Sequence, residues 1–129
     1  MRTLRAISLG VLLWVFIFIE ISITMIGLKL PNTTVWTIHY ILLIPFSILC
    51  AKFYYKSKDN VNGFVLGIVI LIVGIILDMI TTVPLFIIPQ GGNYGTYFSN
   101  MFMIAGFIEL VVIVGIYDLM RRNKNAKKR

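Results

Sequence analysis

Residues 63–89 read GFVLGIVILIVGIILDMITTVPLFIIP, an apolar stretch that is long enough to cross a lipid bilayer. It contains a single acidic residue, Asp78, far from both ends. Small residues in a membrane helix let another backbone approach closely, so a helix face that carries them is predicted to face other helices and to hold Asp78 away from lipid. At about 100° per residue, one narrow arc of this helix contains Gly63, Gly67, Gly74, Asp78 and Thr81.

Three further apolar runs of similar length predict three more membrane-spanning helices. The four expected spans cover residues 6–28, 35–53, 63–88 and 97–119, followed by a basic tail at 120–129. The first run is longer than the apolar core of a cleavable signal peptide, which is about 7–15 residues, so we expect a membrane helix there. With 59% apolar and 13% charged residues among 129, the sequence predicts one transmembrane domain.

The basic residues predict the orientation of these spans. Eleven of the twelve Lys and Arg residues lie at the N-terminus, between the second and third spans, or in the tail, and Lys29 alone lies on the other side. The positive-inside rule therefore predicts that both termini are cytoplasmic. Short connections favour an antiparallel up-down bundle of four helices. Because membrane topology explains the net charge of +7, we expect no nucleic-acid partner.

Four ionisable residues lie within the predicted spans: Glu20, His39, Asp78 and Glu109. At a rise of about 1.5 Å per residue, Glu20 and Asp78 each lie roughly 20 Å from the cytoplasmic side, and His39 lies at a similar level. An isolated charge at the bilayer centre costs at least about 2.5–3.5 kcal/mol. We therefore expect protonated acids, a bound cation, or a water-filled cavity.

Two interpretations of these residues stay open. In the first, they form a proton- or cation-handling site, because intramembrane acids are functional candidates by default. In the second, they hold the helices together through hydrogen bonds with one another or with the nearby hydroxyl groups of Thr24, Thr81 and Thr82. No cofactor is predicted, and whether a metal binds is left open.

The small residues predict where helices meet. Four glycines on inward-facing arcs are expected to pack against neighbouring helices: Gly63, Gly67, Gly74 and Gly106. The same pattern on the third span fits a seam between two copies of the chain. The lipid bilayer is the expected partner, together with a second copy of the chain and with anionic lipid at the basic tail.

The third span and the residues before it also resemble a known family. Tyr54-Tyr55-Lys56 and the segment LGIVILIVGIILDMITTVPLF, which ends at Phe86, look like an uncharacterised family of small prokaryotic four-helix integral membrane proteins. The resemblance implies a location in a prokaryotic plasma membrane. That family has no assigned activity, so the resemblance assigns no role to any residue.

Two function hypotheses follow. The first is a small transporter-like protein that handles protons or cations through its intramembrane carboxyl groups. The second is a non-transporting membrane subunit, or a module that binds a lipid-like ligand or a partner helix. An intramembrane enzyme comes third, after these two, because the sequence lacks a phosphate-binding glycine loop, a zinc-binding HExxH motif and a nucleophile elbow. The first hypothesis requires an aqueous route to the acids, whereas the second requires an apolar cavity with the acids paired.

Overall fold

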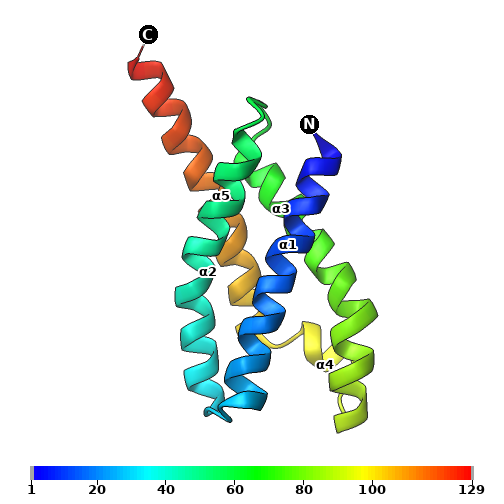
Figure 1. Cartoon of the computed structure of the whole chain (residues 1–129). Helices are drawn as coiled ribbons and strands as arrows, with labels where there is room; N and C mark the ends of the chain where they lie inside the picture. The colour runs from blue at the N-terminus through cyan, green and yellow to red at the C-terminus, as the bar shows by residue number, and fades with distance from the viewer. Residues whose placement is uncertain (1, 129) are drawn as a thin grey trace.

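The computed structural model describes residues 2–128, and all regular secondary structure in this part of the chain is helical. Four helical stretches are long and apolar enough to span a membrane, and they pack as a bundle (Figure 1). These stretches are Thr3–Gly27, Asn32–Tyr55, Gly63–Gln90 and Met101–Lys127. The predicted all-α fold with four membrane-length helices is confirmed.

Two of the long helical stretches consist of an α-helix that continues as a π-helix. Helix α1 (Thr3–Ser22) continues as a short π-helix, η1 (Ile23–Gly27), and α2 (Asn32–Tyr55) follows. Helix α3 (Gly63–Leu77) continues as a π-helix, η2 (Asp78–Ile87), and a 3₁₀ turn, η3 (Ile88–Gln90). A five-residue helix, α4 (Tyr94–Phe98), precedes α5 (Met101–Lys127).

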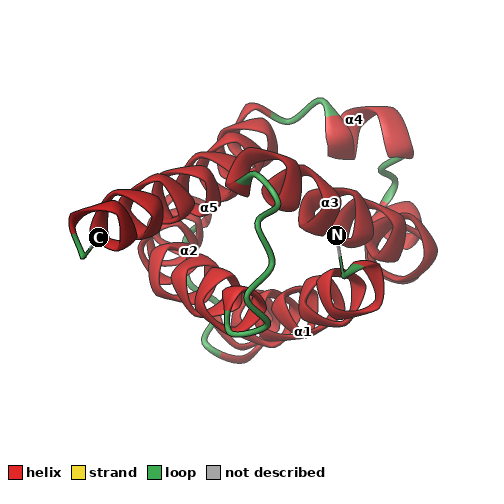
Figure 2. Cartoon of the chain, turned by 90° about the horizontal axis from the view of Figure 1, so that it is seen from above, coloured by secondary structure: helices red, strands yellow, loops and turns green. Residues whose placement is uncertain are grey.

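The four long helices form a ring. Helix α1 packs against α2 and α3, and α5 packs against the other sides of α2 and α3. Successive helices run in opposite directions, and both ends of the chain lie at the same end of the bundle (Figure 1). We call this the terminal end and the opposite one the far end. The loop between α2 and α3 crosses the ring at the terminal end (Figure 2).

The terminal half of the bundle is closely packed around a continuous apolar core. Leu13, Tyr54, Leu66, Ile70 and Val114 come from all four long helices, and each is at most 2% exposed. Since burial of such side chains excludes both lipid and water, this half of the bundle fixes the positions of the helices. The functional candidates lie beyond it, toward the far end.

Two of the four predicted packing glycines make close helix contacts. A Cβ atom built on Gly63 would lie 2.6 Å from the Val114 backbone oxygen, and one on Gly67 would lie 3.0 Å from the Val111 Cα. On Gly106 it would make an ordinary contact, 3.6 Å from a ring nitrogen of His39.

The prediction for Gly74 is wrong. A Cβ atom there would meet nothing within 4 Å. Gly74 lines a cavity instead of a helix contact. The reason is that α3 and α5 pack closely near Gly63 and Gly67, whereas no side chain or backbone fills the space beside Gly74.

The outer surface of α3 is apolar. Val65, Ile68, Ile72 and Ile76 recur at helical spacing on one side of the helix, and each is nearly half exposed. Exposed aliphatic side chains at this density are unfavourable in water, whereas they are solvated by lipid tails. This surface therefore indicates contact with a lipid bilayer.

An ionic cluster fastens the terminal end. The Asp118 carboxylate is 2% exposed and accepts hydrogen bonds from the Gly63 N–H at 3.0 Å, from Arg121 at 2.7 Å and from Arg122 at 2.9 Å. Arg122 also donates to the Asn60 carbonyl at 2.7 Å. The first N–H groups of a helix lack partners within it, so Asp118 of α5 completes the start of α3.

The last span differs from the expected bounds at both of its ends. It begins at Met101 rather than at residue 97, because the Asn100 side chain accepts a hydrogen bond from the Phe102 N–H and caps the helix there. It then continues to Lys127, so most of the tail expected beyond residue 119 is helical.

In η2, Pro84 leaves a backbone carbonyl without its usual donor, and Tyr94 supplies one. In a π-helix, each N–H bonds to the carbonyl five residues earlier, and Pro84 has no N–H to give to the Met79 carbonyl. The Tyr94 hydroxyl of α4 donates to that carbonyl at 3.0 Å. A membrane helix tolerates proline where a neighbour satisfies the freed carbonyl, and this bond also holds α4 against η2.

Candidate functional site

A cavity of about 240 Å³ lies between the helices, and all four long helices line it. It extends along α1 and η1 from Gly10 to Ile26 and reaches α4 at Tyr97. Most of its wall is aliphatic or aromatic. Its aromatic residues include Trp14, Phe18, Trp36, Phe86, Tyr97 and Phe107.

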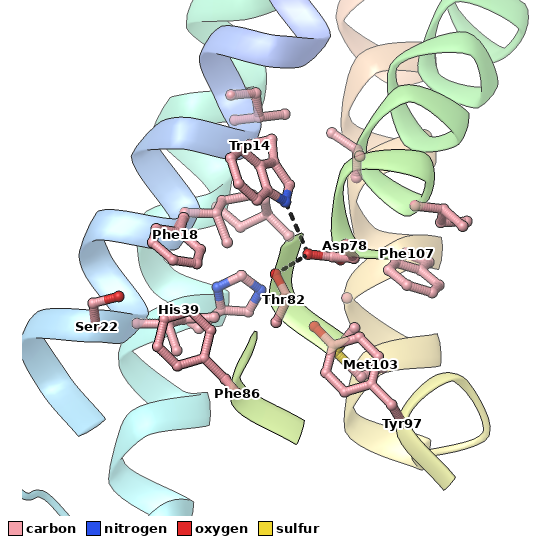
Figure 3. A pocket seen from close by; sticks show the side chains of 18 of the residues that line it. Trp14, Phe18, Ser22, His39, Asp78, Thr82, Phe86, Tyr97, Met103 and Phe107 are labelled. Carbon is pink, nitrogen blue, oxygen red and sulfur yellow. Dashed lines mark hydrogen bonds between the residues drawn. The ribbon is translucent and has the colours of Figure 1, made fainter. Parts of the chain in front are cut away.

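Among the described residues, Asp78 is the one carboxylic acid that lines the cavity. It is the first residue of η2, and its Oδ1 atom accepts hydrogen bonds from Trp14 Nε1 and from the Thr82 hydroxyl, both at 2.8 Å (Figure 3). The hydroxyl group of Tyr97 points toward the same carboxyl group (Figure 3). Donors from α1 and η2 therefore fix the position of Asp78, as predicted for an acid that faces the bundle interior.

Aromatic rings extend from Trp14 along one wall. Trp14 stacks on Phe18 with ring centroids 5.1 Å apart, and Phe18 contacts Phe86 of η2 at 5.6 Å. The two rings on α1 are four residues apart and so lie on one face of the helix. This arrangement connects α1 to η2 beside the cavity.

Glu20 makes a separate interaction. Its Oε2 atom lies 3.1 Å from His39 Nδ1, and both residues are buried, at 8% and 7% exposure. The Thr24 hydroxyl donates to the backbone carbonyl of Glu20 at 3.0 Å and not to its carboxyl group. Glu20 Oε1 is buried without a hydrogen-bond partner among the described residues.

Glu109 does not line the cavity, but it lies near His39, which does. It is half-buried on α5 and interacts electrostatically with His39 and with Tyr40. His39 is thus at hydrogen-bond distance from an acid of α1 and interacts electrostatically with an acid of α5. Its ring also contacts Trp36 edge-on, with centroids 5.5 Å apart.

The structure thus divides the predicted site residues into two groups. Five line the cavity: His39, Gly74, Asp78, Thr82 and Gly106. Six others lie outside its lining: Glu20, Thr24, Gly63, Gly67, Thr81 and Glu109. The two acids of matching predicted depth, Glu20 and Asp78, hydrogen-bond to different partners. Among residues 2–128, no group of three or more His, Cys, Asp and Glu side chains could hold a metal ion.

Sequence reasoning missed Trp14 and Tyr97. A signal for Trp14 was present, because it lies well inside a span, away from the membrane interfaces where tryptophan is common. A buried indole N–H needs an acceptor, and an acid on another span is a suitable one. Tyr97 carried no such signal, because it was expected at the start of a span and not on a separate helix.

The fold and the cavity define the class of protein. This is a small integral membrane protein whose four apolar helices form a bundle and together line a cavity. Comparisons with protein-family models, with curated proteins and with solved structures find no match to the chain.

Proposed function

We propose that this protein binds a lipid-like, amphiphilic small molecule in the cavity, within the membrane. The observation that supports the proposal is a mainly apolar and aromatic cavity with a few polar groups, three of which, Asp78, Thr82 and Tyr97, lie together. Ligand sites commonly combine these two features, because apolar surface contributes affinity and a few polar groups orient the ligand.

The volume indicates how much of a ligand the cavity itself can hold. A cavity of about 150 Å³ lined by aliphatic and aromatic side chains holds benzene. By proportion, the cavity of about 240 Å³ accommodates about ten non-hydrogen atoms. A ligand of that size is one ring with a short substituent, or the end of a longer lipid.

The arrangement of the acids favours binding over ion conduction. Glu20 is paired with His39, and Asp78 hydrogen-bonds to Trp14 and Thr82. An ion pathway requires polar groups in series, whereas the cavity that Asp78 faces is lined mainly by apolar side chains. Proton or cation handling through Asp78 therefore remains our second proposal, motivated by a carboxyl group at the cavity wall.

We infer that a ligand enters from the bilayer between α3 and α5. Leu71 and Phe107 line the cavity and also an adjoining surface groove with Ile108, Val111 and Val112. We propose that a membrane-dissolved ligand enters by displacing the Phe107 ring. We also infer that the terminal end is cytoplasmic, because the positive-inside rule applies to its basic residues.

The two tryptophans provide the test. The chain has two Trp residues, Trp14 and Trp36, and both line the cavity. In a ¹H–¹⁵N spectrum of the protein in nanodiscs, two indole signals are expected. Titration with tert-butylbenzene, which has about ten non-hydrogen atoms, should shift both signals to saturation.

A variant that fills the cavity is the control for this titration. Gly74→Leu adds four carbon atoms, about two fifths of the capacity estimated above, at a position with no atom within 4 Å of the new Cβ. It should abolish the saturable shift, whereas Ile68→Leu on the lipid-facing side should not. If both variants respond like the wild type, the ligand lies outside the cavity and the proposal fails.

A further inference from the structure

We propose that the ligand of this cavity is an organic cation, an alkylated amine or ammonium group on an apolar body, with Asp78 as its counter-charge. The inference rests on the proposed ligand-binding function and specifies the chemical class of the ligand. Three features of the cavity carry it: its charge, its aromatic wall, and the neutral donors that hold Asp78.

The cavity has an acid without a basic partner. Among the described residues that line it, Asp78 is the one Asp or Glu, and none is Lys or Arg. The two donors to Asp78 Oδ1, an indole and a hydroxyl, are both neutral. His39 also lines the cavity, but its Nδ1 atom lies against Glu20. A positively charged ligand would supply the counter-charge that the chain itself does not provide.

The aromatic wall favours the same ligand class. Trp14, Phe18 and Phe86 form one continuous wall beside Asp78, and Trp36 of α2 also lines the cavity. Alkylated ammonium groups bind to the faces of aromatic rings, most strongly to tryptophan and most of all where water is excluded. The aromatic wall and the Asp78 carboxylate would therefore both bind the same ammonium group of the ligand.

The chemistry of the cavity disfavours other charged ligands. An anion would be repelled by the Asp78 carboxylate and would meet no Lys or Arg in the described lining. A small metal ion requires several oxygen or nitrogen ligands, and no cluster of three acid, His or Cys side chains exists in the described chain. An alkylated ammonium group needs fewer polar contacts, because its methyl groups are compatible with an apolar wall.

A charge series of one shape tests the inference. Phenyltrimethylammonium, tert-butylbenzene and phenylphosphonate have the same number of non-hydrogen atoms and are cationic, neutral and anionic. Each is titrated into the wild-type protein in nanodiscs at fixed pH, with concentrations expressed per lipid, and the indole signals of Trp14 and Trp36 are followed. The cation should saturate the shift at a concentration at least about tenfold lower than the neutral compound, and the anion should not bind.

Two variants assign the preference to Asp78. Asp78→Asn keeps an oxygen that accepts from Trp14 and Thr82 but removes the charge. It should weaken binding of the cation by about tenfold or more and leave that of tert-butylbenzene unchanged. Glu109→Gln removes an acid outside the cavity lining and should leave the preference intact.

The outcomes separate this inference from the proposed function. If tert-butylbenzene binds and the cation binds no more tightly, the ligand class is wrong while the ligand-binding function stands. A preference for the cation that persists in Asp78→Asn also overturns the inference. If neither compound shifts the indole signals to saturation, the proposed function itself fails. The wild-type series gives a decision even if Asp78→Asn does not fold.

Discussion

The contact between Gly63 and α5 predicts a large effect of adding one methyl group. In Gly63→Ala, the new Cβ would lie 2.5 Å from the Asp118 Cβ and 2.6 Å from the Val114 carbonyl oxygen. Since favourable carbon contacts lie at about 3.5–4.0 Å, α3 and α5 would have to separate by about 1 Å. Backbone and a buried side chain oppose the methyl group, so it cannot be accommodated by a flexible side chain.

The magnitude follows from two costs. Overpacking of this kind destabilises by about 1–3 kcal/mol. Separation also stretches the hydrogen bond from the Gly63 N–H to Asp118, now 3.0 Å, and a hydrogen bond to a charged group contributes about 1.5–3 kcal/mol. If about half of that bond is lost, we expect Gly63→Ala to lower the free energy of unfolding by about 2–4 kcal/mol.

Gly74→Ala is the matched control. Gly74 lies in the same helix, and its new Cβ would meet nothing within 4 Å. Replacement of glycine by alanine in a helix interior stabilises by about 0.5–1 kcal/mol, so this variant should be slightly more stable than the wild type. Unfolding of both in mixed micelles, followed by circular dichroism against denaturant, measures the difference. If Gly63→Ala unfolds at the wild-type midpoint, the close contact of α3 with α5 at Gly63 does not exist.

Three further predictions concern the polar contacts and the orientation. Asp118→Asn should lower the free energy of unfolding by about 1.5–3 kcal/mol in the same assay, because the acceptor of the hydrogen bonds from two arginines is then no longer charged. An unchanged unfolding midpoint would contradict the ionic cluster. Hydrogen bonds from Tyr54 and from the backbone N–H of Arg2 lower the pKa of Asp59 to about 2, so the ionised carboxylate should stabilise the fold fully above about pH 4 and lose this effect as the pH falls toward 2. The free energies of unfolding of the wild type and of Asp59→Asn, measured against pH, test this, and a difference between them that does not change with pH would refute it. A reporter that fluoresces only in the cytoplasm should be bright when fused to the C-terminus, and a dark fusion with a periplasm-active counterpart would reverse the proposed orientation.

The sequence predicted the spans because their number depends on composition alone. Long apolar runs separated by polar loops have few alternatives in a bilayer, and all four occur as helices. The ends of the last span were less predictable. Its start depends on the Asn100 cap, and its continuation to Lys127 takes it beyond the apolar residues, where hydropathy gives no information.

The inward arc of α3 was predicted correctly in direction but not in its contacts. Four of its five residues face inward: Gly63 and Gly67 pack on α5, and Gly74 and Asp78 line the cavity. The fifth, Thr81, lies outside the cavity lining. A helical arc specifies the direction of a side chain and not the distance to the neighbouring helix. That distance depends on residues of other helices, which the periodicity of α3 does not contain.

The pairing of the acids shows the same limit. Equal depth placed Glu20, His39 and Asp78 at one level, but depth leaves the rotation of each helix about its axis undetermined. The structure pairs Glu20 with His39, whereas Asp78 bonds to Trp14, which is four residues from Phe18 on the same face of α1. A single helix thus presents one acid to α2 and an indole donor to η2.

The position of the cavity follows from how residue size is distributed along the bundle. At the terminal end, Ala6, Ala51, Gly63 and Gly67 are buried, and small side chains let helices approach closely. Toward the far end, the rings of Trp14, Phe18 and Phe86 lie between α1 and η2. Trp14 and Phe18 stack on each other along α1, and the tilted contact of Phe18 with Phe86 lies between α1 and η2 beside the cavity. We infer that small residues at one end and large aromatic rings at the other produce a bundle that is closed near its termini and hollow where Asp78 lies.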